Sequence, residues 1–217
     1  MAALDQLKKL LRDCRAVQSA VLPVLLRHAY YRSRGLNLLT SNRVQIHGLG
    51  NIRTTGLLKV GLNYVGFMGP HDRTLIRVAG RLQVDGNFNI GKGCRIDIGE
   101  HALVQLGSGY LNPNTRLVIM HGLRIGQACA ISWDCQFLDE DFHTLSQVDR
   151  PAATRDARIE VGDRVWIGSQ VTVLKGARLP NGSVVGAGSV VRSRFTEENT
   201  LIAGNPAQVV RRGVTWA

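Results

Sequence analysis

A strict repeat fills the stretch from Val161 to Val191, VGDRVWIGSQVTVLKGARLPNGSVVGAGSVV, and decides the fold. An aliphatic residue recurs there at every sixth position: Val161, Ile167, Val173, Leu179, Val185 and Val191. A helix returns its side chains to one face with a period near 3.6 and a flat strand with a period of about 2, so neither explains this spacing. A short strand followed by a turn does, and a parallel β-helix of triangular coils is built from such units.

The residues between the aliphatic positions support the same interpretation. A small residue or a valine stands four places after each of the first five aliphatic residues, at Val165, Val171, Ala177, Ser183 and Ser189. Glycines recur where the chain would turn a corner, which favours backbone without a Cβ. Coils of this kind stack and bury a continuous aliphatic column that no single repeat could bury. The sequence therefore predicts an all-β solenoid.

The phase of the repeat continues upstream. Ile125, Ile131 and Phe137 keep the count of six, and the interval from Phe137 to Val161 is again a multiple of six. Residues 138–158 are thus predicted to be a loop extruded from an unbroken helix. Looser hexads begin at about Val84, and residues 36–83 are expected to form an irregular first coil with a loop. Three cysteines are predicted to be buried at small inward positions: Cys94, Cys129 and Cys135.

Residues 1–35 follow a different pattern, which predicts an amphipathic helical segment. Pro23 is expected to end or kink the first helix, and residues 24–34 to form a second short one. The uncharged run from Ala16 to Leu26 is too short for a bilayer span, which needs about 20 apolar residues. Apolar residues recur at threes and fours along the first helix: Leu4, Leu7, Leu11, Cys14, Val17 and Val21.

The chain carries a net charge of +11, from 27 basic and 16 acidic residues. This balance favours acidic partners, but no nucleic-acid-binding motif is present, so a nucleic-acid partner is not expected. The N-terminal segment either caps the solenoid or a neighbouring subunit, or contacts an anionic membrane surface, and the two are compatible. The basic side chains that favour the membrane are Lys8, Lys9, Arg12, Arg15 and Arg27.

The extruded loop contains the strongest candidate for chemistry. His143 follows Asp139 and Asp141 at the point where the chain leaves the solenoid. A histidine accepts a proton near neutral pH, and a neighbouring carboxylate can fix its tautomer. The alternative is a surface histidine in a polar loop, and the residues alone favour neither.

Several motifs taken together resemble the hexapeptide-repeat acyltransferases. They are the hexads, WIG at 166–168, AGS at 187–189 and AGNPAQVVRR at 203–212. The run ISWD…LDEDFH is most similar to sugar O-acetyltransferases of the galactoside, maltose and surface-polysaccharide kind. The resemblance covers about 84–212 and leaves 213–217 as a C-terminal tail. It implies a left-handed β-helix, a homotrimer, and acetyl-coenzyme A bound between neighbouring subunits.

The resemblance also implies roles for individual residues. His143 matches the general base that takes the proton of an acceptor hydroxyl, with Asp139 or Asp141 orienting it. Asn112 matches an acceptor-pocket residue, and Trp166 a tryptophan near the reacting centre. The positions that match the coenzyme site are Ser169 and Ala187, along the pantetheine arm, and Arg192, Arg194, Arg211 and Arg212, near the phosphates.

Other functions on this fold remain open at this point. A zinc enzyme needs three converging histidines, and the loop region offers no closely spaced pair, so no metal is expected. A non-catalytic scaffold or binding protein is an alternative, as is an acyltransferase with a non-sugar acceptor. The long loop argues against a scaffold. We expect a saccharide acceptor in capsule or lipopolysaccharide assembly. We also expect a cytoplasmic location, which includes the inner membrane surface as an alternative.

Overall fold

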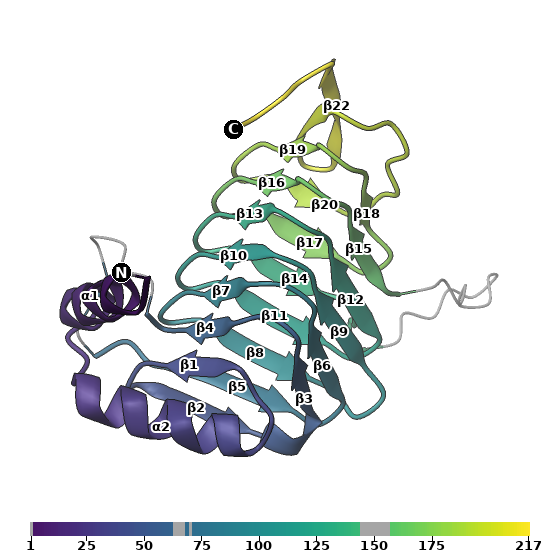
Figure 1. Ribbon diagram of the computed structural model, residues 1–217. Coiled ribbons are helices and arrows are strands. Elements are labelled where there is room, and N and C mark those ends of the chain that lie inside the picture. The colour runs from purple at the N-terminus through teal and green to yellow at the C-terminus, as the bar shows by residue number, and fades with distance from the viewer. Residues whose placement is uncertain (1, 63–67, 70, 144–156) are drawn as a thin grey trace.

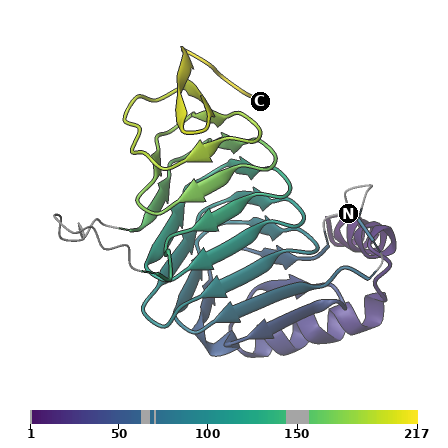
Figure 2. The ribbon, with the colours of Figure 1, turned by 180° about the vertical axis from the view of Figure 1, so that it is seen from behind.

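The fold is that of a left-handed parallel β-helix, seen in a computed structural model that describes residues 2–62, 68–69, 71–143 and 157–217. Its coils rise from the N-terminal to the C-terminal end of the molecule (Figure 1, and from behind in Figure 2). Each coil contributes one strand to each of three sheets, called here A, B and C, and neighbouring coils pair in parallel. The fold predicted from the six-residue period is confirmed.

The strands of each sheet follow one another in chain order, at intervals of three up to β20, and β21 and β22 then complete sheet A. Sheet A contains β1 (Leu38–Thr40), β4 (Leu58–Val60), β7 (Phe88–Ile90), β10 (Gly109–Leu111), β13 (Cys129–Ile131), β16 (Trp166–Ile167), β19 (Val184–Val185), β21 (Thr200–Gly204) and β22 (Ala207–Arg212). Sheet B contains β2 (Val44–His47), β5 (Thr74–Val78), β8 (Arg95–Ile98), β11 (Arg116–Ile119), β14 (Gln136–Leu138), β17 (Thr172–Leu174) and β20 (Val190–Val191). Sheet C contains β3 (Ile52–Thr54), β6 (Arg81–Val84), β9 (Leu103–Leu106), β12 (Gly122–Ile125), β15 (Ile159–Val161) and β18 (Arg178–Leu179), and a 3-10 turn, η1 (Leu49–Asn51), precedes β3.

The aliphatic residues of the repeat fill the interior of the coils. The six aliphatic residues that recur at every sixth position from Val161 to Val191 are each at most 1% exposed. In sheet A the stacking is direct, because Ile131 pairs with Ile167 and Ile167 with Val185. Full burial of one such side chain stabilises the fold by about 1.5–3 kcal/mol. The three cysteines predicted to be inward are also buried.

Regular coils begin earlier than the sequence predicts. Strands β1 to β6 already pair in the same parallel order as the later ones, so the segment predicted as an irregular first coil with a loop belongs to the regular solenoid from Leu38 onward. The repeat is obscured there because the corners vary in length: β4 ends at Val60 and β5 begins only at Thr74. A corner of unusual length shifts the count of six without changing which residues point inward.

Two helices precede the coils, α1 (Ala2–Ala16) and α2 (Val21–Ser33). The break between them lies before Pro23, because Gln18 adopts a left-handed conformation that ends α1. Pro23 sits in the first turn of α2, where its missing N–H costs no hydrogen bond, so the predicted break at Pro23 is wrong.

Both ends of the solenoid are covered. Helix α2 lies across the first coil (Figure 1), with Val24 fully buried and the Nδ1 atom of His28 2.7 Å from the carbonyl oxygen of Leu38. Helix α1 packs beside sheet A through Cys14 and Val17. At the other end β22 pairs antiparallel with β21. These caps protect the terminal strands from pairing with other chains.

Candidate active site

The corners of the coils form two edges along sheet B. At the A–B edge the chain passes from sheet A to sheet B, through residues 91–94, 112–115, 132–135, 168–171 and 186–189. At the B–C edge it passes from sheet B to sheet C, and the described corner residues are 99–102, 120–121, 139–143, 157–158, 175–177 and 192–194. The strands of sheet B separate the two edges, and a three-residue strand such as β17 spans about 10 Å.

His143 lies at the B–C edge, just after β14, and its side chain is exposed. The Nδ1 atom lies 3.3 Å from the carbonyl oxygen of Asp141. With Nδ1 protonated and donating to this carbonyl, Nε2 carries the lone pair that can accept a proton. This is the tautomer that a general base requires.

The carboxylate of Asp139 is fully buried and bound to backbone donors. Its oxygens accept hydrogen bonds from the N–H groups of Met120 (2.6 Å), His121 (2.8 Å) and Gly122 (2.7 Å). Asp139 therefore ties the start of the loop to the corner of the preceding coil. Of the two aspartates predicted to orient His143, this one has its oxygens directed at other groups.

Asp141 contacts His143 only through its backbone in the described structure, since its carboxylate lies 2.5 Å from the Nζ atom of Lys175. Lys175 belongs to the next coil along the same edge. The ion pair is half-exposed, so solvent screens it. It nevertheless joins the base of the turn to the corner above it.

A second pair supports the same turn from the coil below. The Nε2 atom of His121 lies 2.7 Å from Oε2 of Glu140, whose Oε1 accepts the N–H groups of Asp141 and Phe142. The hydrogen bond with His121 is the main reason why the pKa of Glu140 is lowered. Phe142, with a φ of 59°, occupies the left-handed region and is 58% exposed. Such a conformation is rare for a bulky residue and is held by these contacts.

Sequence reasoning missed His121, Glu140 and Lys175. All three occupy corners of consecutive coils at one edge, so they come together although they are far apart in the chain. The register of sheets B and C would have identified them, because β11, β14 and β17 are adjacent strands. The irregular spacing of the corners hid that register in the sequence.

The predicted acceptor and pantetheine residues lie at the other edge of sheet B. Asn112, Ser169 and Ala187 occupy corners of the A–B edge, where the N–H of Gly188 donates to the carbonyl of Ser169 at 2.9 Å. A Cβ at Gly168 would lie 2.8 Å from the backbone of the next coil, so only glycine fits there. The small side chains of Ser169 and Ala187 therefore lie on closely stacked backbone at this edge.

Trp166 is exposed on the outer face of sheet A. Its Nε1 atom lies 3.3 Å from Oγ of Ser132, and its ring is 6.3 Å from the ring of Trp216. Trp216 in turn donates from Nε1 to the carbonyl of Arg164 at 2.8 Å. The predicted tail therefore folds back on the wall beside Trp166, which the sequence did not indicate.

The predicted phosphate-binding arginines divide between two places. Arg192 and Arg194 lie at the B–C edge, and the Nε atom of Arg194 is 3.3 Å from the carbonyl of Gly176. Arg211 and Arg212 end β22 on the side of sheet A, where Arg212 pairs with Glu197 at 2.9 Å. Within one chain, the four arginines are therefore not gathered at one place. His143 and Ser169 also lie apart, at different edges.

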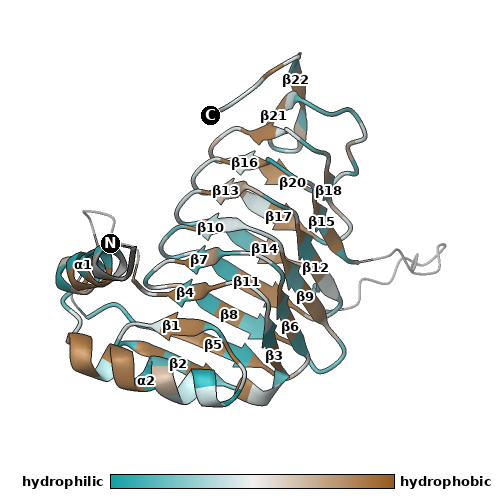
Figure 3. Ribbon diagram, in the orientation of Figure 1, coloured by the Kyte–Doolittle hydropathy of each residue, from teal (hydrophilic) through white to brown (hydrophobic). Residues whose placement is uncertain are grey.

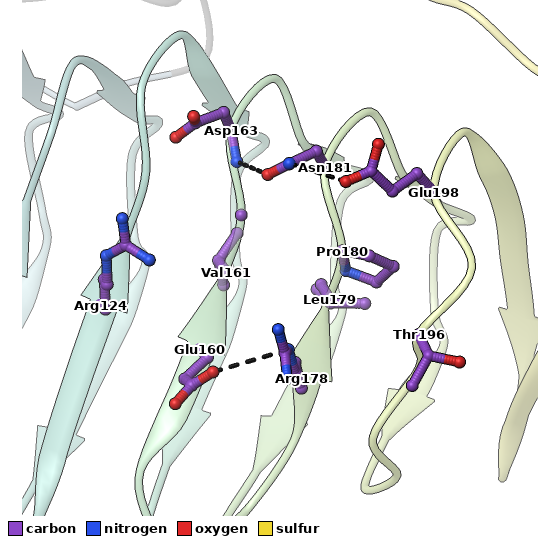
Figure 4. A pocket seen from close by; sticks show the side chains of 11 residues that line it. Arg124, Glu160, Val161, Asp163, Arg178, Leu179, Pro180, Asn181, Thr196 and Glu198 are labelled. Atoms are coloured by element: carbon purple, nitrogen blue, oxygen red, sulfur yellow. Dashed lines mark hydrogen bonds and ion pairs between the residues drawn. The ribbon is translucent and has the colours of Figure 1, made fainter.

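A cavity of about 320 Å³ lies on the outer side of sheet C and contains none of the predicted site residues (Figure 4). Its side chains partner one another: Glu160 lies 3.6 Å from Arg178, and Asn181 links the backbone of Asp163 to Glu198, each at 2.8 Å. These contacts stitch successive coils together, so we assign the cavity a structural origin.

Cysteine chemistry is disfavoured in the coils. Burial raises the pKa of Cys94 to about 12 and the pKa of Cys129 and of Cys135 to about 11, so these thiols are protonated at neutral pH. In the part of the chain that the structure describes, no three His, Cys, Asp or Glu side chains are grouped to hold a metal ion.

Comparison with known proteins identifies relatives over almost the whole chain. A 24.8 kDa protein of the cps region of Klebsiella pneumoniae, itself uncharacterised, is 35% identical over 98% of this chain and 96% of that protein. A protein of Escherichia coli named as a lipopolysaccharide biosynthesis O-acetyl transferase, WbbJ, is 32% identical over 63% of this chain and 74% of that protein. The chain belongs to this O-acetyltransferase family. No protein-family profile matches it.

Solved structures agree with this membership at the level of fold. A variant of the N-acyltransferase AntD of Bacillus cereus, solved with dTDP and coenzyme A, superposes with a TM-score of 0.51. The superposition covers 81% of each chain at 16% identity. The hexapeptide-repeat architecture is therefore shared with an acyltransferase, while the identity is too low to transfer residue roles.

Proposed function

We propose that this chain transfers an acetyl group from acetyl-coenzyme A to a hydroxyl of a saccharide in surface-glycan biosynthesis. The single observation that carries the proposal is the turn at the B–C edge, where Nδ1 of the exposed His143 lies 3.3 Å from the carbonyl oxygen of Asp141 and Nε2 has no partner among the described residues. Membership of the O-acetyltransferase family supports the reaction class, and the coenzyme A bound to AntD supports the donor class.

The proposed reaction needs one proton acceptor and no covalent enzyme intermediate. As the acceptor oxygen attacks the thioester carbonyl, its proton moves to Nε2 of His143. The tetrahedral intermediate then collapses, the C–S bond breaks, and the imidazolium returns the proton to the coenzyme A sulfur. The carbonyl of Asp141 holds Nδ1–H throughout and stabilises the charged ring. We assign Asp139 to anchoring the turn through its backbone hydrogen bonds.

A homotrimer is part of the proposal. His143 lies at the B–C edge and Ser169 at the A–B edge, so one chain supplies only half of a site. If the A–B edge of one copy faces the B–C edge of another, the halves are combined, and threefold symmetry closes such a contact. Asn112 would then meet the acceptor, Trp166 would flank the reacting centre, and Ser169 with Ala187 would line the pantetheine arm.

The coenzyme phosphates would be bound by arginines near the C-terminal end. No described residue forms a hydrogen bond or ion pair with the guanidinium of Arg192 or Arg211, which leaves both able to bind an anion. Arg194 is a third candidate on the same edge as Arg192.

The deciding experiment measures binding and turnover separately. Calorimetric titration with acetyl-coenzyme A should give micromolar affinity near one site per chain, and Ser169→Phe or Arg211→Gln should weaken it. His143→Ala should keep this affinity while turnover falls about 10²–10⁴-fold, because the base acts in the chemical step. Lost binding with unchanged turnover in His143→Ala would overturn the role of the base.

We further propose a cytoplasmic location with peripheral attachment to the inner membrane surface. Support comes from α2, whose N-terminal part is brown in Figure 3 and which carries exposed large side chains: Leu22 is 67%, Leu26 62% and Tyr30 49% exposed. The basic residues predicted for this role, on α1 and at Arg27, suit anionic headgroups. Neither helix is long and apolar enough, in the part of the chain that the structure describes, to cross a bilayer.

Liposome sedimentation tests the attachment. Vesicles with anionic lipid should carry the protein down, neutral vesicles should carry less, and Leu22→Ser with Leu26→Ser should release it. Protein that stays in solution with anionic vesicles would refute the proposal.

A further inference from the structure

Four arginines form a strip on consecutive coils, along the side of sheet B next to the A–B edge. Arg43 precedes β2 and Arg73 precedes β5, while Arg95 begins β8 and Arg116 begins β11. Arg73, Arg95 and Arg116 are exposed and Arg43 is half-buried. Each coil adds about 4.8 Å, so the strip is about 14 Å long.

The register places these side chains on one outward face. Arg95 pairs directly with Arg116. Arg43 neighbours Arg73, because the N–H of Thr74 donates to the carbonyl of Arg43. The two pairs are offset by two residues along the strand direction. Side chains two residues apart in a strand lie on the same face, so all four arginines share one face of sheet B. The guanidinium of Arg95 reaches back to the carbonyl of Arg73 and so joins the pairs.

Like charges placed directly opposite each other destabilise a sheet, and no described carboxylate forms an ion pair with any of the four arginines. Asp97, on the same sheet, is bound to Arg77 at 2.6 Å. Among the described residues, none forms a hydrogen bond or ion pair with the guanidiniums of Arg43, Arg73 or Arg116. The arrangement therefore favours an external anion.

The upper end of the strip reaches the predicted acceptor corner. Arg116 follows Asn112 by four residues in the same coil. It also lines a cavity of about 100 Å³ with Asn114, Asp134 and Gln136. Asp134 is the carboxylate in this cavity and would repel an anion there. The amide groups beside it suit sugar hydroxyls.

We propose that the strip of Arg43, Arg73, Arg95 and Arg116 binds an acidic polysaccharide and guides it to the Asn112 corner. This rests on the proposed function, because it names the acceptor class of that site. The length of the strip argues for a polymer with repeated carboxylates, since one phosphate or diphosphate would contact the arginines of only one or two coils. Guanidinium groups bind carboxylates in a planar, bidentate geometry.

Binding of a labelled oligogalacturonate, followed by fluorescence anisotropy on the full-length protein, tests the proposal. Arg95→Gln with Arg116→Gln should weaken binding about tenfold, since exposed ion pairs each contribute modestly. Asp134→Asn should strengthen it. The matched control is Arg81→Gln with Arg124→Gln, which removes the same charge from exposed positions on sheet C and should change affinity less than twofold.

Four outcomes would overturn the proposal. Neutral dextran of equal length could bind as well as oligogalacturonate, or the control variant could lose as much affinity as the strip variant. Pyrophosphate alone could compete at the same concentration as the polymer, which would indicate a single diphosphate site. The strip variant could instead alter the oligomeric state, which would assign the arginines to an interface.

The same variants separate this proposal from the proposed function. The strip variant should bind acetyl-coenzyme A like the wild type, and its KM for an acidic acceptor should rise while its kcat changes little. Arginine-dependent glycan binding without any acetyl transfer would refute the proposed reaction but support the strip as a glycan-binding site.

Discussion

The interior and the corners of the same coils obey different rules. Inside, Ile131, Ile167 and Val185 stack in register, and each position must fit the column above and below it. At the B–C edge the corresponding corners carry unrelated residues, among them His143 and Lys175. The column constrains only the inward positions, so the corners can vary and acquire chemistry. The six-residue repeat in the sequence therefore reflects the packing of the inward positions.

The largest expected effect comes from breaking the column. Ile167→Asp should give no folded protein, because an unpaired buried charge costs about 3–5 kcal/mol and the lost apolar burial about 1.5–3 kcal/mol more, against a total stability of about 5–15 kcal/mol. Ile167 is fully buried. Circular dichroism during heating measures the outcome. Gln170→Asp, at an exposed corner of the same coil, is the control and should fold normally.

A smaller effect is expected at Asp139, a residue of the B–C edge whose side chain is fully buried. Asp139→Ala should lower the free energy of unfolding by about 2–4 kcal/mol, because three backbone N–H groups lose a charged acceptor. Urea denaturation measures this. Asp141→Ala, which breaks a half-exposed ion pair, should cost at most about 1 kcal/mol. Equal losses in the two variants would contradict the anchoring role of Asp139.

The same contrast explains what could be predicted from the sequence. Inward positions such as Val173 were identified because the column imposes a fixed period. For residues 36–83 the sequence predicted only an irregular first coil with a loop, because long corners interrupt that period. His143 was found through its motif, whereas His121 and Lys175 were not, since contacts between corners depend on the register of stacked coils. The hydrogen bonds of Asp139 depend on backbone geometry and leave no pattern in the sequence.

The buried thiols should make the column sensitive to alkali. Burial raises the pKa of Cys129 and Cys135 from the ordinary 9.0 to about 11. The unfolded chain then releases these protons at lower pH than the folded one, so stability is complete below pH 9 and falls as pH rises from 9 toward 11. Urea denaturation across this range should show a smaller loss for Cys129→Ala with Cys135→Ala than for the wild type. An unchanged slope would contradict the burial of the thiols as the cause.

The smallest expected effect concerns the exposed pair beneath the His143 turn. Because the pKa of Glu140 is lowered, mainly by the hydrogen bond with His121, its contribution to stability should be present above pH 4.5 and be lost as pH falls through the lowered pKa. Glu140→Gln should therefore unfold at a slightly lower urea concentration than the wild type at pH 7. At strongly acidic pH the two proteins should unfold at the same urea concentration. His121→Asn, which removes the partner, should behave like Glu140→Gln at pH 7. If both variants match the wild type at pH 7 in stability and turnover, the pair does not hold the turn, and the corner is organised by Asp139 and Lys175 alone.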